Sequence, residues 1–124
     1  MNSSDLSDFL NLDNKDIAFR SLIEKEVTIY ATLMRKKGSS IPLIFNEDEQ
    51  ILFYDIYIRT LLQKTISGII SNFDLTYICD CLTLGERISY ETEEGKNIIF
   101  NIADPEINGG FKSHEELERM LETL

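Results

Sequence analysis

Three carboxylates lie within four residues in the segment Glu91-Thr92-Glu93-Glu94. Dense negative charge attracts lysine and arginine side chains and speeds association with a basic partner. The surrounding residues 86–124 hold ten acids against four bases, a net charge of −6. A solvated surface that keeps the protein soluble is the alternative interpretation of this excess. We predict a partner-binding surface composed of Glu86, Glu91, Glu93, Glu94, Asp104 and Glu106.

Catalytic chemistry requires a nucleophile with its base, a carboxylate pair in a cleft, or a set of metal ligands. His114 is the single histidine, and its place in the first turn of a helix explains it as an exposed residue. The sequence contains no G-x-G-x-x-G, Walker A, G-x-S-x-G or H-E-x-x-H motif. We therefore predict no catalytic residues and no enzymatic activity.

The two cysteines, Cys79 and Cys81, are separated by one residue. In a helix, such neighbours point to nearly opposite sides, so they do not pair readily in a disulfide. A metal site would need more ligands than these two thiols and the distant His114. We expect both cysteines to be small residues in the core or at its boundary in a reduced cytosolic protein, with no metal and no cofactor, whereas a redox or zinc role is the alternative.

The chain has 124 residues, a hydrophobic fraction of 43% and a net charge of −10. This predicts one domain over residues 1–124, with residues 1–12 as a loose acidic arm or a short turn around Leu6, Phe9 and Leu10. No apolar run approaches the roughly 20 residues of a membrane span, and the start lacks the order of a secretion signal. We expect a cytoplasmic protein that binds neither membranes nor nucleic acid directly, since both are polyanions.

The spacing of apolar residues predicts the helices that position the acidic residues. Apolar residues at three- and four-residue steps predict a first helix ending at Gly38, and Asn46 is the expected N-cap of a long central helix that includes Tyr54. Asp74 is the expected cap of a third helix ending at Gly85, and Ser113 starts a capping box for the last. The predicted helices cover residues 16–37, 47–70, 75–84 and 114–124.

Between the third and the last predicted helix, the spacing of apolar residues changes from three or four residues to two. Ile88, Tyr90 and Thr92 alternate with polar residues, and Ile98, Phe100 and Ile102 do the same around a turn at residues 93–96. This alternation predicts an antiparallel β-hairpin that packs on the helices. The expected fold is mainly α (α+β): about four helices, with a small antiparallel hairpin before the last one.

The chain resembles immunity proteins of bacterial toxin–immunity pairs of the contact-dependent growth inhibition type. The resemblance lies in length, acidity and single-domain build, and in the stretch Leu75–Gly85 followed by residues 88–102 and Asp104-Pro105-Glu106. It implies a stoichiometric inhibitor that binds a cognate toxin domain in the cytoplasm and blocks its active site or the access of its substrate. The implied partner is a basic domain, often a nuclease, and a monomer of this chain would form a heterodimer with it.

Two other functions fit an acidic protein of this size. One is a chaperone or adaptor of a secreted effector, which would dimerise and bind extended segments through apolar surface. The other is an inhibitor that mimics the charge of nucleic acid, but mimics spread acids over their whole length. Residues 17–85 hold eight acids against seven bases, which counts against mimicry.

Overall fold

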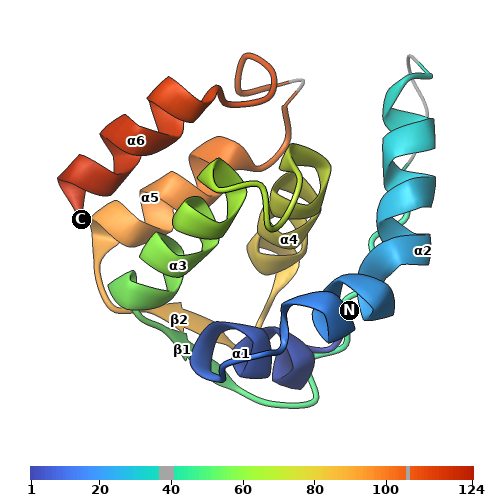
Figure 1. The fold of residues 1–124 in the computed structure, drawn as a ribbon, viewed down its shortest axis with the longest axis horizontal. Helices are drawn as coiled ribbons and strands as arrows, with labels where there is room; N and C mark the ends of the chain where they lie inside the picture. The colour runs from blue at the N-terminus through green and yellow to red at the C-terminus, as the bar shows by residue number, and fades with distance from the viewer. Residues whose placement is uncertain (37–40, 106) are drawn as a thin grey trace.

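The computed structural model describes residues 1–36, 41–105 and 107–124, and it shows a mainly α-helical protein (Figure 1). The described residues form six helices and a two-stranded sheet. None of these helices is long and apolar enough to cross a membrane. In chain order the elements are α1 (Ser3–Asn11), α2 (Asp16–Met34), β1 (Ile51–Phe53), α3 (Asp55–Ile66), α4 (Asn72–Leu84), β2 (Ile88–Tyr90), α5 (Glu93–Ile102) and α6 (His114–Thr123).

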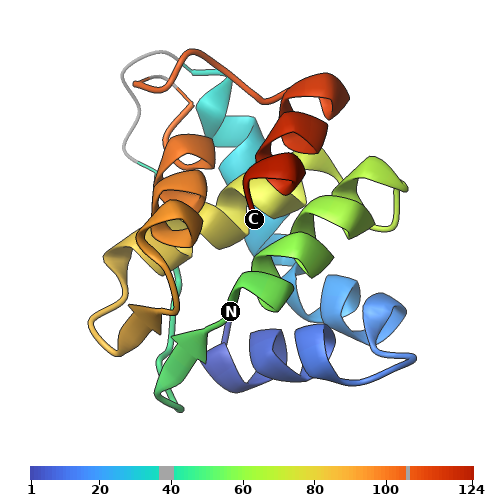
Figure 2. The same ribbon diagram turned by 90° about the vertical axis from the view of Figure 1, so that its left-hand side faces the viewer.

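Helix α4 is the centre of the molecule. Its residues 74–82 are all buried, as expected for a helix covered on every side. It contacts α2, α3 and α5, while α6 packs against α3 (Figures 1 and 2). The helix predicted over 75–84 is thus the central one, and Gly85 ends it as expected. Its N-cap is Ser71 rather than Asp74, which is instead the third residue of a capping box.

The sheet joins two strands that are distant in the sequence. β1 and β2 pair in parallel, with Ile51 opposite Ile88 and Phe53 opposite Tyr90. Each strand leads within one or two residues into a helix, β1 into α3 and β2 into α5. Because the strands are parallel, both helices begin at the same edge of the sheet.

The predicted antiparallel hairpin is wrong, because its second strand is helix α5. Thr92 caps this helix, its hydroxyl accepting a hydrogen bond from the N–H of Gly95 at 3.0 Å. Ile98, Ile99 and Ile102 are buried at helical spacing, whereas Phe100 is exposed. Ile99 breaks the alternation on which the hairpin depended, and helix formation buries it.

The long helix predicted over 47–70 is also wrong. Ile51–Phe53 is a strand with alternating burial, and Tyr54 is extended before α3 begins at Asp55. Asn46 caps no helix; its N–H donates to the carbonyl of Met1 at 2.9 Å. The apolar run supplies two elements because its first part pairs with β2, a contact that the local sequence does not reveal.

The first residues form a helix rather than a loose arm. Leu6 and Phe9 of α1 are buried, and the Phe9 ring stacks on Phe19 of α2 at 4.3 Å between centroids. α2 begins at Asp16, close to the prediction, but its predicted end at Lys37 and Gly38 lies outside the described residues. The capping box of α6, formed by Ser113 and Glu116, is confirmed.

Candidate partner-binding site

The two strand-to-helix turns meet at one corner of the molecule, which we call the acidic corner and define as Asp55, Glu91, Glu93 and Glu94. The Glu91 carboxylate accepts a hydrogen bond from the N–H of Asp55 at 2.9 Å and so caps α3 from a distant part of the chain. The Thr92 hydroxyl donates to Asp55 Oδ1 at 2.7 Å. These bonds fix the starts of α3 and α5 side by side.

Close packing makes this corner rigid. Gly95 in the first turn of α5 is buried, and a Cβ there would lie 2.7 Å from both Asp55 Oδ1 and Ile58 Cδ1. Only glycine therefore lets α5 approach α3 this closely. Asp55, Glu93 and Glu94 lie in the first turns of α3 and α5, and Glu91 lies between β2 and α5, where its carboxylate is hydrogen-bonded to the N–H of Asp55.

Glu93 and Glu94 are the carboxylates available to a partner. Both are exposed in the first turn of α5, where the helix dipole favours negative charge. Within the described part of the chain, neither side chain is in an ion pair or a hydrogen bond. Glu91 is also exposed, but its carboxylate already serves α3. The corner therefore offers a partner two carboxylates that form no hydrogen bond or ion pair with the described residues, although their charge favours the start of α5.

Apolar side chains adjoin the corner on β1 and the start of α3. Leu52 is 43% exposed, Tyr54 41% and Ile56 60%. The Tyr54 ring meets Tyr57 edge-on, with 5.4 Å between centroids, so its position is fixed. Tyrosine is enriched at the centre of protein–protein interfaces, and polar residues form their rim, so Tyr54 with the neighbouring carboxylates fits such an arrangement.

Sequence reasoning missed this apolar part of the site. Tyr54 is expected inside the central helix, whereas it lies in the turn before α3 and is exposed. The alternation of Ile51, Leu52 and Phe53, if interpreted as a strand, would have placed Leu52 on the outer face.

The six predicted binding residues do not lie together. Glu91, Glu93 and Glu94 share the acidic corner, but Glu86 precedes β2 at the opposite end of the strand, where its N–H donates to Glu47 at 2.8 Å. Asp104 follows the C-terminal end of α5, about 15 Å along the helix axis from its start. Glu106 lies outside the described residues.

Asp104 belongs to a structural network around α4. Its N–H donates to Asp80 Oδ1 at 2.6 Å, and the other oxygen of Asp80 accepts from the Tyr30 hydroxyl. Burial raises the pKa of Asp80, although both hydrogen bonds favour its charged form. This carboxylate ties α2, α4 and the residues after α5 together.

The cysteines and the histidine, whose side chains could bind a metal or take part in redox chemistry, occupy positions that a structural role explains. Cys79 and Cys81 are buried and unpaired with each other, and burial raises the pKa of Cys79 well above its usual value and that of Cys81 to about 12. Such thiols are unreactive. His114 is exposed in the first turn of α6, as predicted. No three metal-ligating side chains among residues 1–36, 41–105 and 107–124 gather as a metal site would need.

A groove of about 630 Å³ runs along α2 to the start of α4. Its charged residues include Arg20, whose Nε lies 3.4 Å from Asp74 Oδ2. Asp74 also completes the capping box of α4, so this pair is part of the helix end.

No model of a known protein family, no curated protein and no solved structure matches this chain. The function must therefore be argued from the geometry and chemistry of the acidic corner.

Proposed function

We propose that this protein is an immunity protein that binds a cognate cytotoxic domain, in particular a basic nuclease, and neutralises it by stoichiometric inhibition. The observation that carries the proposal is the acidic corner: two uncommitted carboxylates on a rigid helix start, beside exposed Tyr54, Leu52 and Ile56.

The corner suits a basic protein partner for electrostatic reasons. A nuclease presents lysine and arginine around its active site because it binds phosphates. Glu93 and Glu94 would meet such side chains at the rim, and this attraction would raise the association rate. The exposed apolar side chains would supply the desolvated contact that slows dissociation, since aromatic residues at the centre of an interface contribute most of its energy.

The decisive experiment captures partners with the tagged chain from its own host, at low and at high salt. The captured protein is purified and its toxic activity is titrated with added chain. We expect one basic protein whose activity is lost at a one-to-one ratio. A captured protein that has no toxic activity, or one that stays active when saturated with this chain, would contradict the proposal.

Charge-reversal variants locate the interface. The double variant E93K/E94K removes the two carboxylates, and E118K/E122K makes the same change on exposed positions of α6 as its control. Because lysines at the start of α5 oppose the helix dipole, the urea midpoint of each variant is measured as well, and association rates are compared only under conditions in which both variants are folded. At low salt, we expect E93K/E94K to slow association with the captured toxin by about tenfold or more, in line with the size of electrostatic steering. Equal rates for the two variants would place the interface elsewhere.

A second candidate function is that of a chaperone or adaptor for a secreted effector. It is favoured by the exposed side chains of Leu22 and Ile29, which lie seven residues apart and so on the same face of α2. This function predicts a dimer in solution that binds an unfolded effector segment. Sedimentation of the purified chain separates the two functions, because inhibition by a one-to-one complex predicts a monomer.

A further inference from the structure

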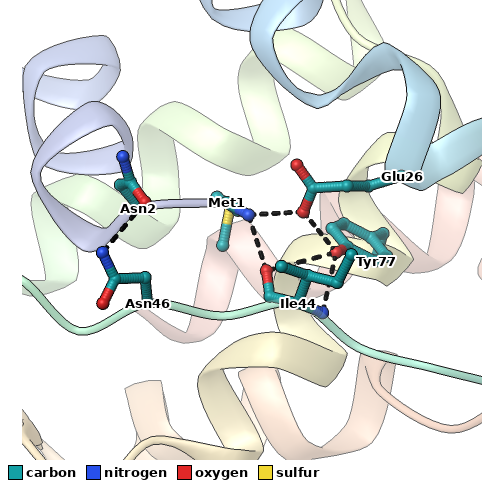
Figure 3. Close-up of polar contacts among 6 residues, drawn as sticks. All are labelled: Met1, Asn2, Glu26, Ile44, Asn46 and Tyr77. Carbon is teal, nitrogen blue, oxygen red and sulfur yellow. Dashed lines mark hydrogen bonds and ion pairs between the residues drawn. The ribbon is translucent and has the colours of Figure 1, made fainter.

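The α-amino group of Met1 lies in a closed set of polar partners (Figure 3). It forms an ion pair with the carboxylate of Glu26 on α2 and donates to the carbonyl of Ile44 at 2.6 Å. The hydroxyl of Tyr77 on α4 donates to the same oxygen of Glu26 at 2.6 Å and accepts from the N–H of Ile44 at 3.2 Å. We call Glu26, Ile44 and Tyr77 the amine site.

The charges of this site are largely removed from water. The Met1 side chain is fully buried, that of Glu26 is 17% exposed, and Tyr77 is fully buried. A buried ion pair that loses one partner leaves the other charge without compensation, and this is strongly destabilising. The amine and Glu26 therefore depend on each other.

Next to the amine site, hydrogen bonds join residues 1–3 to residues 46–49. The N–H of Asn46 donates to the Met1 carbonyl, and the N–H of Ser3 donates to the Asn46 carbonyl, both at 2.9 Å. The Ser3 hydroxyl also donates to the carbonyl of Glu49 at 2.8 Å. Residues 44–49 lead directly into β1 and from there to the acidic corner.

We propose that, in a chain that begins at Met1, the charged α-amino group is a latch, and that its acylation releases residues 1–12 and 44–49 from α2 and α4. An activated acyl donor would transfer its acyl group to the nitrogen. The ammonium first loses one proton, the free amine attacks the acyl carbon, the bond from that carbon to the donor's leaving group breaks with its electron pair, and the nitrogen loses a second proton to become a neutral amide. The amide retains one N–H where the ammonium has three, so it cannot donate to both Glu26 and Ile44. The added acyl atoms would also have to fit into a site that is already filled.

Cyanate is a suitable probe of the charge, because it carbamylates α-amines near pH 7 far faster than lysines, whose pKa is higher by roughly 2 to 3 units. The product is a neutral urea that keeps one N–H on the α-nitrogen, and its two other N–H groups lie beyond the added carbonyl carbon. The rate of modification at Met1 is measured by mass spectrometry of the N-terminal peptide, in native protein and in urea. We expect the native rate to be at least about 100-fold lower, because the amine reacts only after local opening. Equal rates in the two states would overturn the proposal.

The second measurement is the stability of the carbamylated chain against urea. The chain is carbamylated while unfolded in urea, mild base removes the adducts from its thiols, and the chain is then refolded. The control is chain treated while folded, in which exposed lysines react but the latch is protected. We expect a lower urea midpoint and exchange of the Ser3 and Asn46 amide hydrogens at least about tenfold faster. A modified chain with the midpoint and exchange rates of the control would refute the latch.

A thermodynamic cycle identifies the partner of the amine. Carbamylation of Met1 is expected to lower the urea midpoint less in the Glu26→Gln variant than in the original sequence. The reason is that the variant already lacks the carboxylate with which the amine pairs. Glu24→Gln, at an exposed neighbouring position of α2, should respond like the original chain. If the modified chain does not refold, Glu26→Gln alone must still accelerate amide exchange at Ser3 and Asn46. An equal loss in all three backgrounds would exclude Glu26 as the partner.

Discussion

Gly95→Ala tests whether the acidic corner is built as tightly as its geometry indicates. The new methyl group would lie 2.7 Å from Asp55 Oδ1, 2.7 Å from Ile58 Cδ1 and 3.1 Å from Thr92 Oγ1. Ile58 is fully buried, and Asp55 is held by the Thr92 hydroxyl, so neither can move without loss. Helix propensity alone predicts the opposite effect, because alanine is the better helix former.

The magnitude follows from three contributions to the free energy of unfolding. Overpacking costs about 1 to 3 kcal/mol, and a weakened Thr92–Asp55 hydrogen bond costs about 0.5 to 1.5 kcal/mol. Alanine recovers up to about 1 kcal/mol through helix propensity. We expect Gly95→Ala to destabilise the protein by about 0.5 to 3.5 kcal/mol, with a central value of about 2 kcal/mol, since the steric cost exceeds the gain.

Urea unfolding followed by circular dichroism measures this difference. With a slope of about 2 kcal/mol/M, the midpoint of Gly95→Ala should fall by about 1 M. Asn97→Ala is the control, because this exposed position of α5 gains helix propensity without a steric conflict. If Gly95→Ala is as stable as Asn97→Ala, α3 and α5 do not approach as described.

Three further predictions concern caps and buried polar groups. The hydroxyl and N–H of Ser4 lower the pKa of Asp48 to about 2, so this carboxylate stabilises the fold above its ordinary pKa near 4, and the stabilisation disappears as the pH falls toward 2. In an acid titration followed by urea unfolding, the stability of Asp48→Asn should therefore fall less between about pH 4 and pH 2 than that of the original chain. Ser71→Ala removes the α4 capping box and should cost about 0.5 to 2 kcal/mol in urea unfolding. Tyr30→Phe leaves the buried Asp80 without its hydroxyl donor and should cost about 1 to 3 kcal/mol in the same assay.

Local signals in the sequence were sufficient for parts of the fold. The Ser113 capping box and the end of α4 at Gly85 depend on neighbours within a few residues, and both are confirmed. The start of α2 also lies where periodicity placed it. These features need no knowledge of distant contacts.

The errors arise where a distant partner decides the local structure. Ile51–Phe53 becomes a strand because β2 pairs with it, 37 residues further along the chain. The N–H of Asp55 at the start of α3 is satisfied by Glu91, 36 residues away, so no local cap signals that start. The predicted hairpin is wrong for a local reason: Thr92 at the cap and Ile99 in the apolar face favour a helix, and they outweigh the alternation of Ile98, Phe100 and Ile102.

For the candidate site, charge counting found the acidic segment but could not sort its members. Glu91 caps α3, whereas Glu93 and Glu94 have no bonded partner within the described residues. Replacing Glu91 would therefore weaken the fold and the surface together, and a loss of binding would be ambiguous. Changing Glu93 and Glu94 alters the charge that a partner meets while the capping bonds of Glu91 and Thr92 remain. The residues that report most clearly on binding are thus those whose side chains form no hydrogen bond or ion pair with the described residues.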